Sequence, residues 1–337
     1  MKILHTLASP VWSGPAEPVA LIAAAQAALG HHVSVAIDRK RLEVSSEELA
    51  LPRLQELGLL DAAGLELSVK SSPFAAWADM RRLRRISCDI VHSHFTHDHV
   101  VARWGLPRGA KLVRSIHAPR SLRVTMPRCD ALTVPYEALL AQAPNVPSMV
   151  LPALVGPVFA PAADRVAARA ALGLPSGPLV GMVSTLQESR RHDVAVDALA
   201  QLRAREPSAH LVVLGDGAHA ATLRAHVLSV GLKDAVTFAG YQHGDDFAKW
   251  VQAFDEVWVL GLGNDWAARA AAQARRCGAR IVAVDEGALS TYADAVVAPT
   301  PEAVAAAALK PDRRALTVPD PTEVARSLLE LYAKVRA

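Results

Sequence analysis

The sequence predicts an α/β protein with two domains, each built on a parallel β-sheet. Three observations support this prediction. Strand-like and helical segments alternate along the chain, a proline-rich stretch interrupts the alternation once, and the alternation then restarts. The chain has 337 residues, of which 51% are hydrophobic and 20% charged, so it is long enough to form two hydrophobic cores.

The first half opens with a strand, a loop, a helix and a second strand, which is the unit of a parallel sheet. Pro18 lies in the first turn of this helix, and Gly30 ends it. Three further short apolar segments read as strands that end in polar residues. The expected strands of this half are 2–8, 31–37, 88–94, 111–117 and 130–135.

The stretch from 144 to 175 contains six prolines and reads as the connection between the domains. We therefore expect an N-terminal domain at 1–153 and a C-terminal domain at 160–320. Segment 321–337 is amphipathic, and we expect it to form a helix that packs back onto the N-terminal domain. The expected strands after the connection are 178–185, 209–215, 235–240, 256–261 and 280–285. The expected helices between them are 192–206, 219–231, 244–254 and 266–278.

The composition argues against several classes of function. A net charge of +3 and an aromatic content of 5% disfavour a nucleic-acid partner. Cys88, Cys129 and Cys277 lie far apart without metal or redox spacing, so we expect free thiols in a reducing, cytoplasmic compartment. No run of 18 apolar residues predicts a transmembrane helix, and the N-terminus does not resemble a signal peptide.

Four segments, in their order and spacing, resemble a known family. They are GMVSTLQESRRHDVAVDAL at 181–199, LVVLGDG at 211–217, VTFAGY at 236–241 and VWVLGLGNDWAARAAAQARRCGARIVAVDEG at 257–287. The chain resembles the retaining GT-B glycosyltransferases that use nucleotide sugars, the glycosyl transferases group 1 family of bacterial mannosyl-, glucosyl- and lipopolysaccharide-core transferases. The resemblance implies two Rossmann-like domains that face each other across a cleft.

The resemblance also implies a reaction. The C-terminal domain would bind a nucleoside diphosphate sugar, and the N-terminal domain would bind a glycan, a lipid-linked or a small-molecule acceptor. The sugar would be transferred with retention of configuration, without a cofactor and without a metal ion. Fixed cations and oriented amides must then stabilise the charge that grows on the leaving diphosphate.

The cations for that diphosphate are only partly present. Thr185 and Arg190 stand where members of the family place an arginine and, five residues later, a lysine. Arg191 follows and could compensate for the missing cation, although arginine and lysine differ in geometry. Considered alone, Arg190 and Arg191 also fit solvated charges on a helix surface.

A glycine-rich loop followed by a helix offers free N–H groups to a phosphate. Here the loop holds Gly263, Asn264 and Asp265. Asp265 and Gln273 stand where the family has two glutamates, one near the donor sugar and one at the ribose, and Asp265 also fits a helix N-cap. We expect the two side chains to lie on one side of a helix, since eight residues slightly exceed two turns.

Other donor-site positions lie at the ends of expected strands. Gly14 and Pro15 replace a Gly-Gly turn of the family near the donor phosphate, which removes one amide N–H. Four residues would line the nucleoside pocket by resemblance, and each also fits ordinary turn chemistry. These residues are Gly215, Gly217, Gly240 and Tyr241.

Segment VHSHFTHDHV at 91–100 holds four histidines within eight positions. A zinc cage needs three or four convergent ligands, and neither a cysteine nor a His-x3-His spacing supports one, so we expect no metal site. His94 and His97 are expected just beyond a strand, on the acceptor side. His117 matches a histidine that the family places beside the donor sugar. The expected catalytic residues are therefore His117, Asp265 and Arg190.

A basic segment with aromatic neighbours, FAAWADMRRLRRIS at 74–87, reads as a helix. It carries Arg81, Arg82, Arg84 and Arg85 beside Trp77. Such a helix fits peripheral contact with the anionic inner face of the cytoplasmic membrane or with an acidic acceptor, and it also fits an ordinary solvated face.

Two functions stay open. The first is an active glycosyltransferase. The second is a catalytically weak or inactive relative that binds a nucleotide or glycan, or pairs with an active partner, because Pro15, Thr185 and Gln273 depart from the donor-site pattern. Loss of one cation would weaken transition-state stabilisation by about 2–4 kcal/mol, which slows an enzyme without necessarily abolishing its activity.

Overall fold

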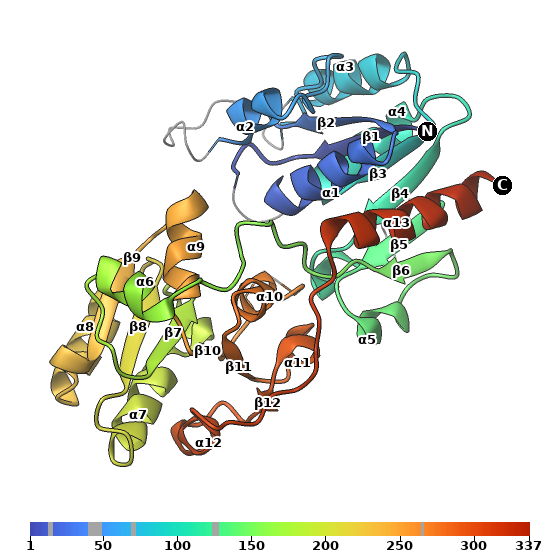
Figure 1. Ribbon diagram of the computed structural model, residues 1–337. Helices are drawn as coiled ribbons and strands as arrows, with labels where there is room; N and C mark the ends of the chain where they lie inside the picture. The colour runs from blue at the N-terminus through green and yellow to red at the C-terminus, as the bar shows by residue number, and fades with distance from the viewer. Residues whose placement is uncertain (13–15, 40–48, 69–71, 123–127, 264–265) are drawn as a thin grey trace. The chain divides into compact units, whose positions relative to one another are not determined.

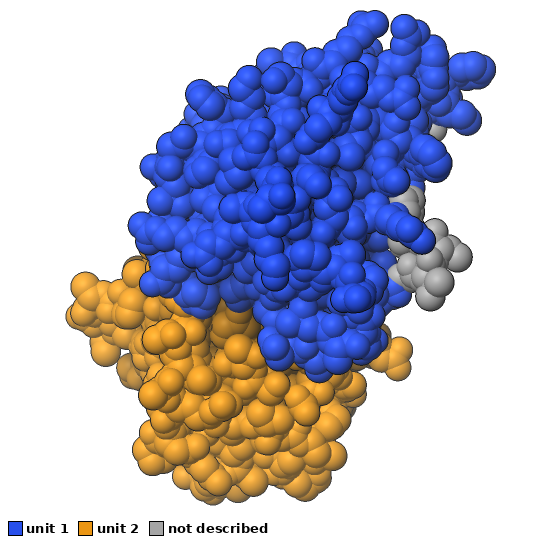
Figure 2. Space-filling view, turned by 90° about the vertical axis from the view of Figure 1, so that its right-hand side faces the viewer, with its two compact units in different colours: residues 1–154, 319–337 blue, residues 155–318 orange. Residues whose placement is uncertain are grey.

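The computed structural model describes residues 1–12, 16–39, 49–68, 72–122, 128–263 and 266–337. The chain divides into two compact units, coloured separately in Figure 2. Unit 1 comprises Met1–Leu154 and Pro319–Ala337, and unit 2 comprises Val155–Val318. The division falls next to the domain limits expected from the sequence, and the C-terminal helix belongs to unit 1.

Unit 1 is a parallel sheet of six strands with helices between them, in the order β2-β1-β3-β4-β5-β6 (Figure 1). The strands are β1 (Lys2–Leu7), β2 (His32–Ile37), β3 (Ile90–Ser93), β4 (Lys111–Ser115), β5 (Ala131–Val134) and β6 (Ser148–Val150). The helices are α1 (Ala16–Ala28), α2 (Ala50–Glu56), α3 (Pro73–Leu83), α4 (Thr96–Gly105), the short η2 (Pro119–Ser121), α5 (Glu137–Leu140) and α13 (Pro321–Arg336).

Unit 2 is a second parallel sheet of six strands, in the order β12-β11-β10-β7-β8-β9. Its strands are β7 (Leu179–Val183), β8 (His210–Leu214), β9 (Val236–Gly240), β10 (Glu256–Val259), β11 (Arg280–Ala283) and β12 (Ala295–Val296). Its longer helices are α6 (Arg165–Ala171), α7 (His192–Arg203), α8 (Ala220–Ser229), α9 (Gly244–Gln252), α10 (Arg269–Arg276) and α12 (Pro301–Ala307). Three short helices complete it, namely η3 (Glu188–Arg190), η4 (Lys233–Ala235) and α11 (Leu289–Tyr292). The predicted α/β fold is confirmed.

Capping residues explain where several helices begin. The Ser72 hydroxyl accepts a hydrogen bond from the Ala75 N–H at the start of α3, and Thr300 does the same for Ala303 at α12. Asp320 and Glu323 form a reciprocal capping box at α13, with Pro321 in its first turn.

Helix α13 packs against α1 and against the sheet of unit 1 (Figure 1). The helix is amphipathic, as the sequence predicted, and its buried face includes Val324, Leu328, Leu331 and Tyr332. They share a hydrophobic cluster with Ile22 of α1 and with residues of β1, β3, β4 and β5. Roughly 25 cal/mol per Å² of apolar surface favours this burial, so α13 is an integral part of unit 1.

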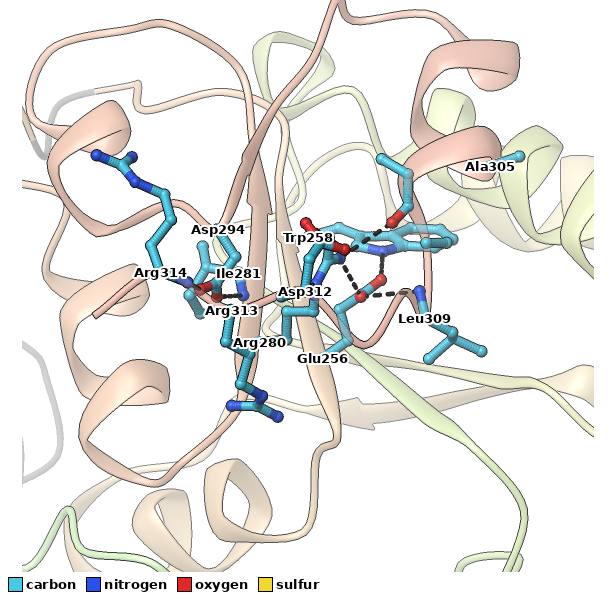
Figure 3. A network of polar contacts seen from close by, with 12 residues as sticks. Glu256, Trp258, Arg280, Ile281, Asp294, Ala305, Leu309, Asp312, Arg313 and Arg314 are labelled. Atoms are coloured by element: carbon cyan, nitrogen blue, oxygen red, sulfur yellow. Dashed lines mark hydrogen bonds and ion pairs between the residues drawn. The ribbon is translucent and has the colours of Figure 1, made fainter. Parts of the chain in front are cut away.

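In unit 2 a buried ion pair joins the start of β10 to the start of β11 (Figure 3). Arg280 Nη1 lies 2.7 Å from Glu256 Oε2, and both side chains are almost fully buried. The Glu256 carboxylate also accepts hydrogen bonds from the Trp258 indole N–H at 2.6 Å and the Leu309 backbone N–H at 2.9 Å. Glu256 and Arg280 are the first residues of their strands, so the ion pair lies away from the carboxyl ends of β10 and β11.

Each sheet has one pair of neighbouring strands from which the chain continues toward opposite edges of the sheet. In unit 1 this pair is β1 and β3, and in unit 2 it is β7 and β10. In open parallel sheets, ligands bind beyond the carboxyl ends of the strands at such switch points. The loops after β1, β3, β7 and β10 are therefore the first places to search for a site.

Candidate functional site

At the switch point of unit 2, the corner between η3 and α7 holds the loop that follows β10. Arg190 Nη1 donates a hydrogen bond to the Gly261 carbonyl at 2.9 Å. A Cβ on Gly263, whose φ is +58°, would lie 2.7 Å from the guanidinium carbon of Arg190. The left-handed φ favours glycine at this position, a Cβ there would displace the guanidinium, and Arg190 thus lies at the predicted donor loop.

Arg191 adopts the left-handed conformation, with a φ of 56°, at the junction of η3 and α7. Its Nη1 donates to the Leu260 carbonyl and lies 2.7 Å from Glu286 Oε1. The second carboxylate oxygen, Oε2, accepts the Leu262 backbone N–H at 3.2 Å. Sequence reasoning missed Glu286. Its only sequence signal was its position in the loop after β11, the strand next to β10.

The loops after β7 and β8 approach each other so closely that two glycines are required. A Cβ on Gly215 would collide with the Ser184 carbonyl, and a Cβ on Gly217 would collide with the Leu186 carbonyl. The Gly215 N–H donates to the Gly240 carbonyl at 2.8 Å, and the neighbouring Tyr241 is 53% exposed. The predicted nucleoside-side residues thus come together on adjacent strands. Thr185 is exposed on the same corner.

The helix expected at 266–278 begins later, at Arg269. Ala268 is its N-cap and has a left-handed φ of 57°, which interrupts the helical conformation ahead of it. The predictions that place Asp265 at the N-cap or on a helical face with Gln273 concern a residue outside the described part of the chain, and they stay predictions. Gln273 lies inside α10 and is 4% exposed. Asn264 and Asp265 lie outside the described residues, as do Gly14 and Pro15.

A second residue pair at this corner was not expected. His192, the first residue of α7, lies with Nε2 3.1 Å from Ser184 Oγ. Burial lowers the pKa of His192 to about 4, so its imidazole is neutral at neutral pH. The pair connects α7 to the end of β7 and thereby fixes the corner that carries Arg190 and Arg191.

At the switch point of unit 1, three buried histidines lie together: His5 of β1, His92 of β3 and His94 directly after β3. His5 Nδ1 lies 3.0 Å from His94 Nε2, and His5 Nε2 lies 2.9 Å from Gln26 Oε1. His92 contacts Tyr332 Oη at 2.6 Å and Ser115 Oγ at 2.8 Å. Sequence reasoning missed His5, which the register of β1 and β3 places opposite His92.

One ring nitrogen from each of His5, His92 and His94 lies within 4.8 Å of the other two, a spacing that a metal ion could use. Both nitrogens of His5 and both nitrogens of His92 already take part in hydrogen bonds inside the protein. A metal ion would have to break several of these bonds. The network is therefore better explained as a buried polar core.

The predicted acceptor-side residues differ in exposure. His94 is 2% exposed and stacks on His92 and His117, with ring centroids 4.5 and 5.7 Å away. His97 lies in the first turn of α4 and is half-buried. Among the described residues, His94 Nδ1, His97 Nε2 and His117 Nε2 are buried and have no hydrogen-bond partner. The structure thus brings His94 and His117 together, but it buries His94.

Helices α3 and α4 expose aromatic side chains on unit 1. The exposed fractions are 82% for Phe74, 55% for Trp77 and 62% for Trp104. The two helices pack closely, since a Cβ on Gly105 would lie 2.8 Å from Met80 Cα. Not every predicted arginine faces solvent freely. Arg82 contacts Asp79 and the Gly64 carbonyl, and Arg84 donates to the Trp104 carbonyl at 2.6 Å.

Two family models match consecutive parts of the chain. Residues 13–146 match the model described as Glycosyltransferase Family 4, and residues 164–308 match the model described as Glycosyl transferases group 1. The chain belongs to the GT-B glycosyltransferases. The Glycosyltransferase Family 4 model covers most of the sheet of unit 1. The Glycosyl transferases group 1 model covers the η3–α7 corner with Arg190 and the loop after β10 with Gly263.

Similar proteins of this family act on different acceptors. A D-inositol 3-phosphate glycosyltransferase of Jonesia denitrificans is 34% identical over 164 residues, 45% of this chain and 38% of the relative. A 2-deoxystreptamine glucosyltransferase of Streptomyces kanamyceticus is 27% identical over 244 residues, 71% of this chain and 57% of the relative. The matched segments therefore span only about two fifths to three fifths of these relatives.

Solved GT-B structures share the fold across the whole chain. HepE of Anabaena, solved in complex with UDP, superposes with a TM-score of 0.70 at 17% identity, and the match covers 100% of this chain and 93% of HepE. At this identity the likeness concerns the fold alone. Among the described residues, no helix is long and apolar enough to cross a membrane.

Proposed function

We propose that this GT-B chain transfers a sugar from a nucleoside diphosphate sugar to an acceptor, with retention of configuration and without a metal ion. The observation that carries the proposal is the Arg190 guanidinium, which lies against Gly261 and Gly263 at the switch point of unit 2. A fixed cation beside a glycine loop is the arrangement needed to stabilise a leaving diphosphate. The UDP complex of HepE supports a nucleotide as the donor's leaving group.

We further propose a cyclitol as the acceptor. The two relatives named above act on an inositol phosphate and on 2-deoxystreptamine, which are both polyhydroxylated six-membered rings. The unpartnered ring nitrogens of His97 and His117 in unit 1 would hydrogen-bond hydroxyl groups of the sugar or the acceptor. His117 would position the donor sugar and His97 the acceptor.

The test is a transfer assay on the purified full chain. Nucleoside diphosphate release is measured for UDP-, GDP- and ADP-sugars with myo-inositol phosphate or 2-deoxystreptamine, with and without EDTA. Arg190→Ala should lower kcat about 10²- to 10³-fold, the effect of losing one transition-state donor. Arg326→Ala, an exposed arginine of α13, is the matched control and should leave kcat unchanged.

The same assay separates the two functions left open by the sequence. Nucleotide binding without transfer would favour the inactive, ligand-binding relative. A Thr185→Arg, Gln273→Glu double variant that gains transfer would support that alternative. If the chain shows no binding and no transfer with any of the three nucleotide classes, the proposal is contradicted.

We also propose that unit 1 contacts the cytoplasmic face of an anionic membrane through α3 and α4. Phe74, Trp77 and Trp104 expose apolar rings there, and Arg81 stacks over Trp77 at 4.7 Å from the ring centroid. Arg85 is exposed on the same helix end. Amphipathic aromatic and basic side chains of this kind prefer the interface between lipid headgroups and acyl chains.

A further inference from the structure

Three charged side chains hold the segment Leu260–Gly263 after β10. Arg190 binds the Gly261 carbonyl and Arg191 binds the Leu260 carbonyl, both from the η3–α7 corner. Glu286 approaches from the loop after β11 and accepts the Leu262 N–H. Two cations and one anion therefore meet at one segment of the loop after β10.

The Glu286 carboxylate uses the two kinds of donor that a phosphoryl group would use. Its Oε1 lies 2.7 Å from Arg191 Nη1, and its Oε2 lies 3.2 Å from the Leu262 nitrogen. A guanidinium and a backbone N–H on a loop beyond a strand are the groups that bind phosphate oxygens. Glu286 thus stands where an anionic oxygen of a ligand would be stabilised.

The Arg191–Glu286 ion pair is held in a way that permits a ligand to replace the carboxylate. The side chains of Arg191 and Glu286 are 34% and 33% exposed, so water and salt screen their attraction. Arg191 also has a left-handed backbone, which is unfavourable for a residue with a Cβ. Such strain is typical of functional positions, and it carries the guanidinium toward the β10 loop.

We propose that Glu286 is an internal anion that competes with the donor diphosphate for Arg191 and the Leu262 N–H. The inference rests on the proposed function, because it assigns these donors to the same diphosphate. When the nucleotide binds, its phosphoryl oxygens take the place of the carboxylate. When the nucleoside diphosphate leaves, Glu286 pairs with Arg191 again, which favours release of a highly charged product.

The test measures affinity for UDP, GDP and ADP by calorimetry on the full chain. Glu286→Gln keeps the size of the side chain and removes its charge, and it should tighten nucleotide binding about two- to fivefold, the range expected for breaking a partly exposed ion pair. Glu188→Gln is the matched control, because Glu188 is an exposed carboxylate on the same corner. It should leave the affinity unchanged. Equal or weaker binding by Glu286→Gln would overturn the inference.

A double-mutant cycle shows whether Glu286 acts through Arg191. Arg191→Ala should weaken nucleotide binding, and Glu286→Gln should have a smaller effect in the Arg191→Ala background than in the wild type, because only the competition for the Leu262 N–H remains. An undiminished effect of Glu286→Gln in that background would contradict the competition. If the wild type and Glu286→Gln both bind nucleotide equally, only the inference fails. If neither binds any nucleotide, the proposed function fails as well.

Discussion

Four buried histidines in unit 1 are neutral because the protein interior disfavours their charge. Burial lowers the pKa of His5 and of His117 to about 4, and it lowers the pKa of His92 and of His94 well below 6.5. Asp98 behaves in the opposite sense, since burial raises the pKa of its carboxyl to about 7. Stability in unit 1 should therefore depend on pH.

The sign of this dependence follows from proton uptake. An unfolded histidine binds a proton near pH 6.5, but the folded His5 does so only near pH 4. The unfolded chain therefore binds more protons between these pH values, and stability is lost as pH falls from 6.5 towards 4. Asp98 acts in the opposite direction, because its folded carboxyl takes up a proton at a higher pH than the unfolded one does.

His5→Gln tests this account. The slope of unfolding free energy against pH, measured by urea titration between pH 4 and 6.5, should decrease by about 1.4 kcal/mol per pH unit, the value of one proton. His32→Gln, at an exposed histidine of β2, should keep the wild-type slope. A slope that His5→Gln leaves unchanged would show that His5 is already protonated in the folded state.

At the scale of elements, α13 attaches the C-terminal segment of the chain to the N-terminal segment, and together they form unit 1. It follows unit 2 in the chain, yet it packs on α1 and supplies Tyr332 to His92, 240 residues away. The Tyr332 hydroxyl satisfies a ring nitrogen that would otherwise be buried without a partner, which typically costs about 1–3 kcal/mol. The helix therefore contributes both apolar burial and polar satisfaction to unit 1.

Leu328→Ala should weaken unit 1 and leave unit 2 intact. Leu328 is fully buried, and removal of a buried leucine side chain costs about 2–5 kcal/mol. Native-state hydrogen exchange should become faster in β4, β5 and β6 and stay unchanged in β7, β8 and β9. Glu330→Ala, an exposed position of the same helix, should change neither set. Faster exchange in both units would contradict a contribution confined to unit 1.

At the scale of the whole molecule, charge and exposed apolar surface are unevenly distributed. The net charge is only +3, yet α3 alone carries Arg81 and Arg82, and Arg84 and Arg85 follow it. Of the large hydrophobic side chains that are exposed in the described part of unit 1, three lie on α3 and α4, and the fourth is Leu57. This concentration supports the proposed membrane contact.

Binding to lipid vesicles tests that contact. The chain should cosediment with phosphatidylglycerol vesicles and not with phosphatidylcholine vesicles. Arg85→Ala should weaken binding about fivefold, since each basic residue near an anionic surface contributes about 1 kcal/mol. Trp77→Ser should weaken it further, whereas Leu57→Ser and Arg326→Ala serve as controls and should bind as the wild type does. Equal binding to both lipids would contradict the electrostatic part of the proposal.

Local sequence patterns were sufficient to predict most helices and strands. They failed where several residues were equally good candidates for the first residue of a helix. The helix expected at 321–337 is observed at Pro321–Arg336, because Asp320, Pro321 and Glu323 form an unambiguous start signal. Helix α10 begins at Arg269 rather than at 266, because its alanine-rich sequence carries no comparable signal. A tertiary hydrogen bond from the Ala288 N–H to the Trp266 carbonyl holds the preceding segment outside the helix.

The sequence by itself determined the alternation of strands and helices, the family, and the residues on the loop after β7, since these depend on short-range periodicity and on motif spacing. Only the tertiary structure decided which charged and polar groups meet. His5 and His94 lie 89 residues apart, and Arg191 and Glu286 lie 95 residues apart. Their contacts depend on the strand order of each sheet, which no local pattern encodes, so the histidine network and the competing carboxylate became visible only in the fold.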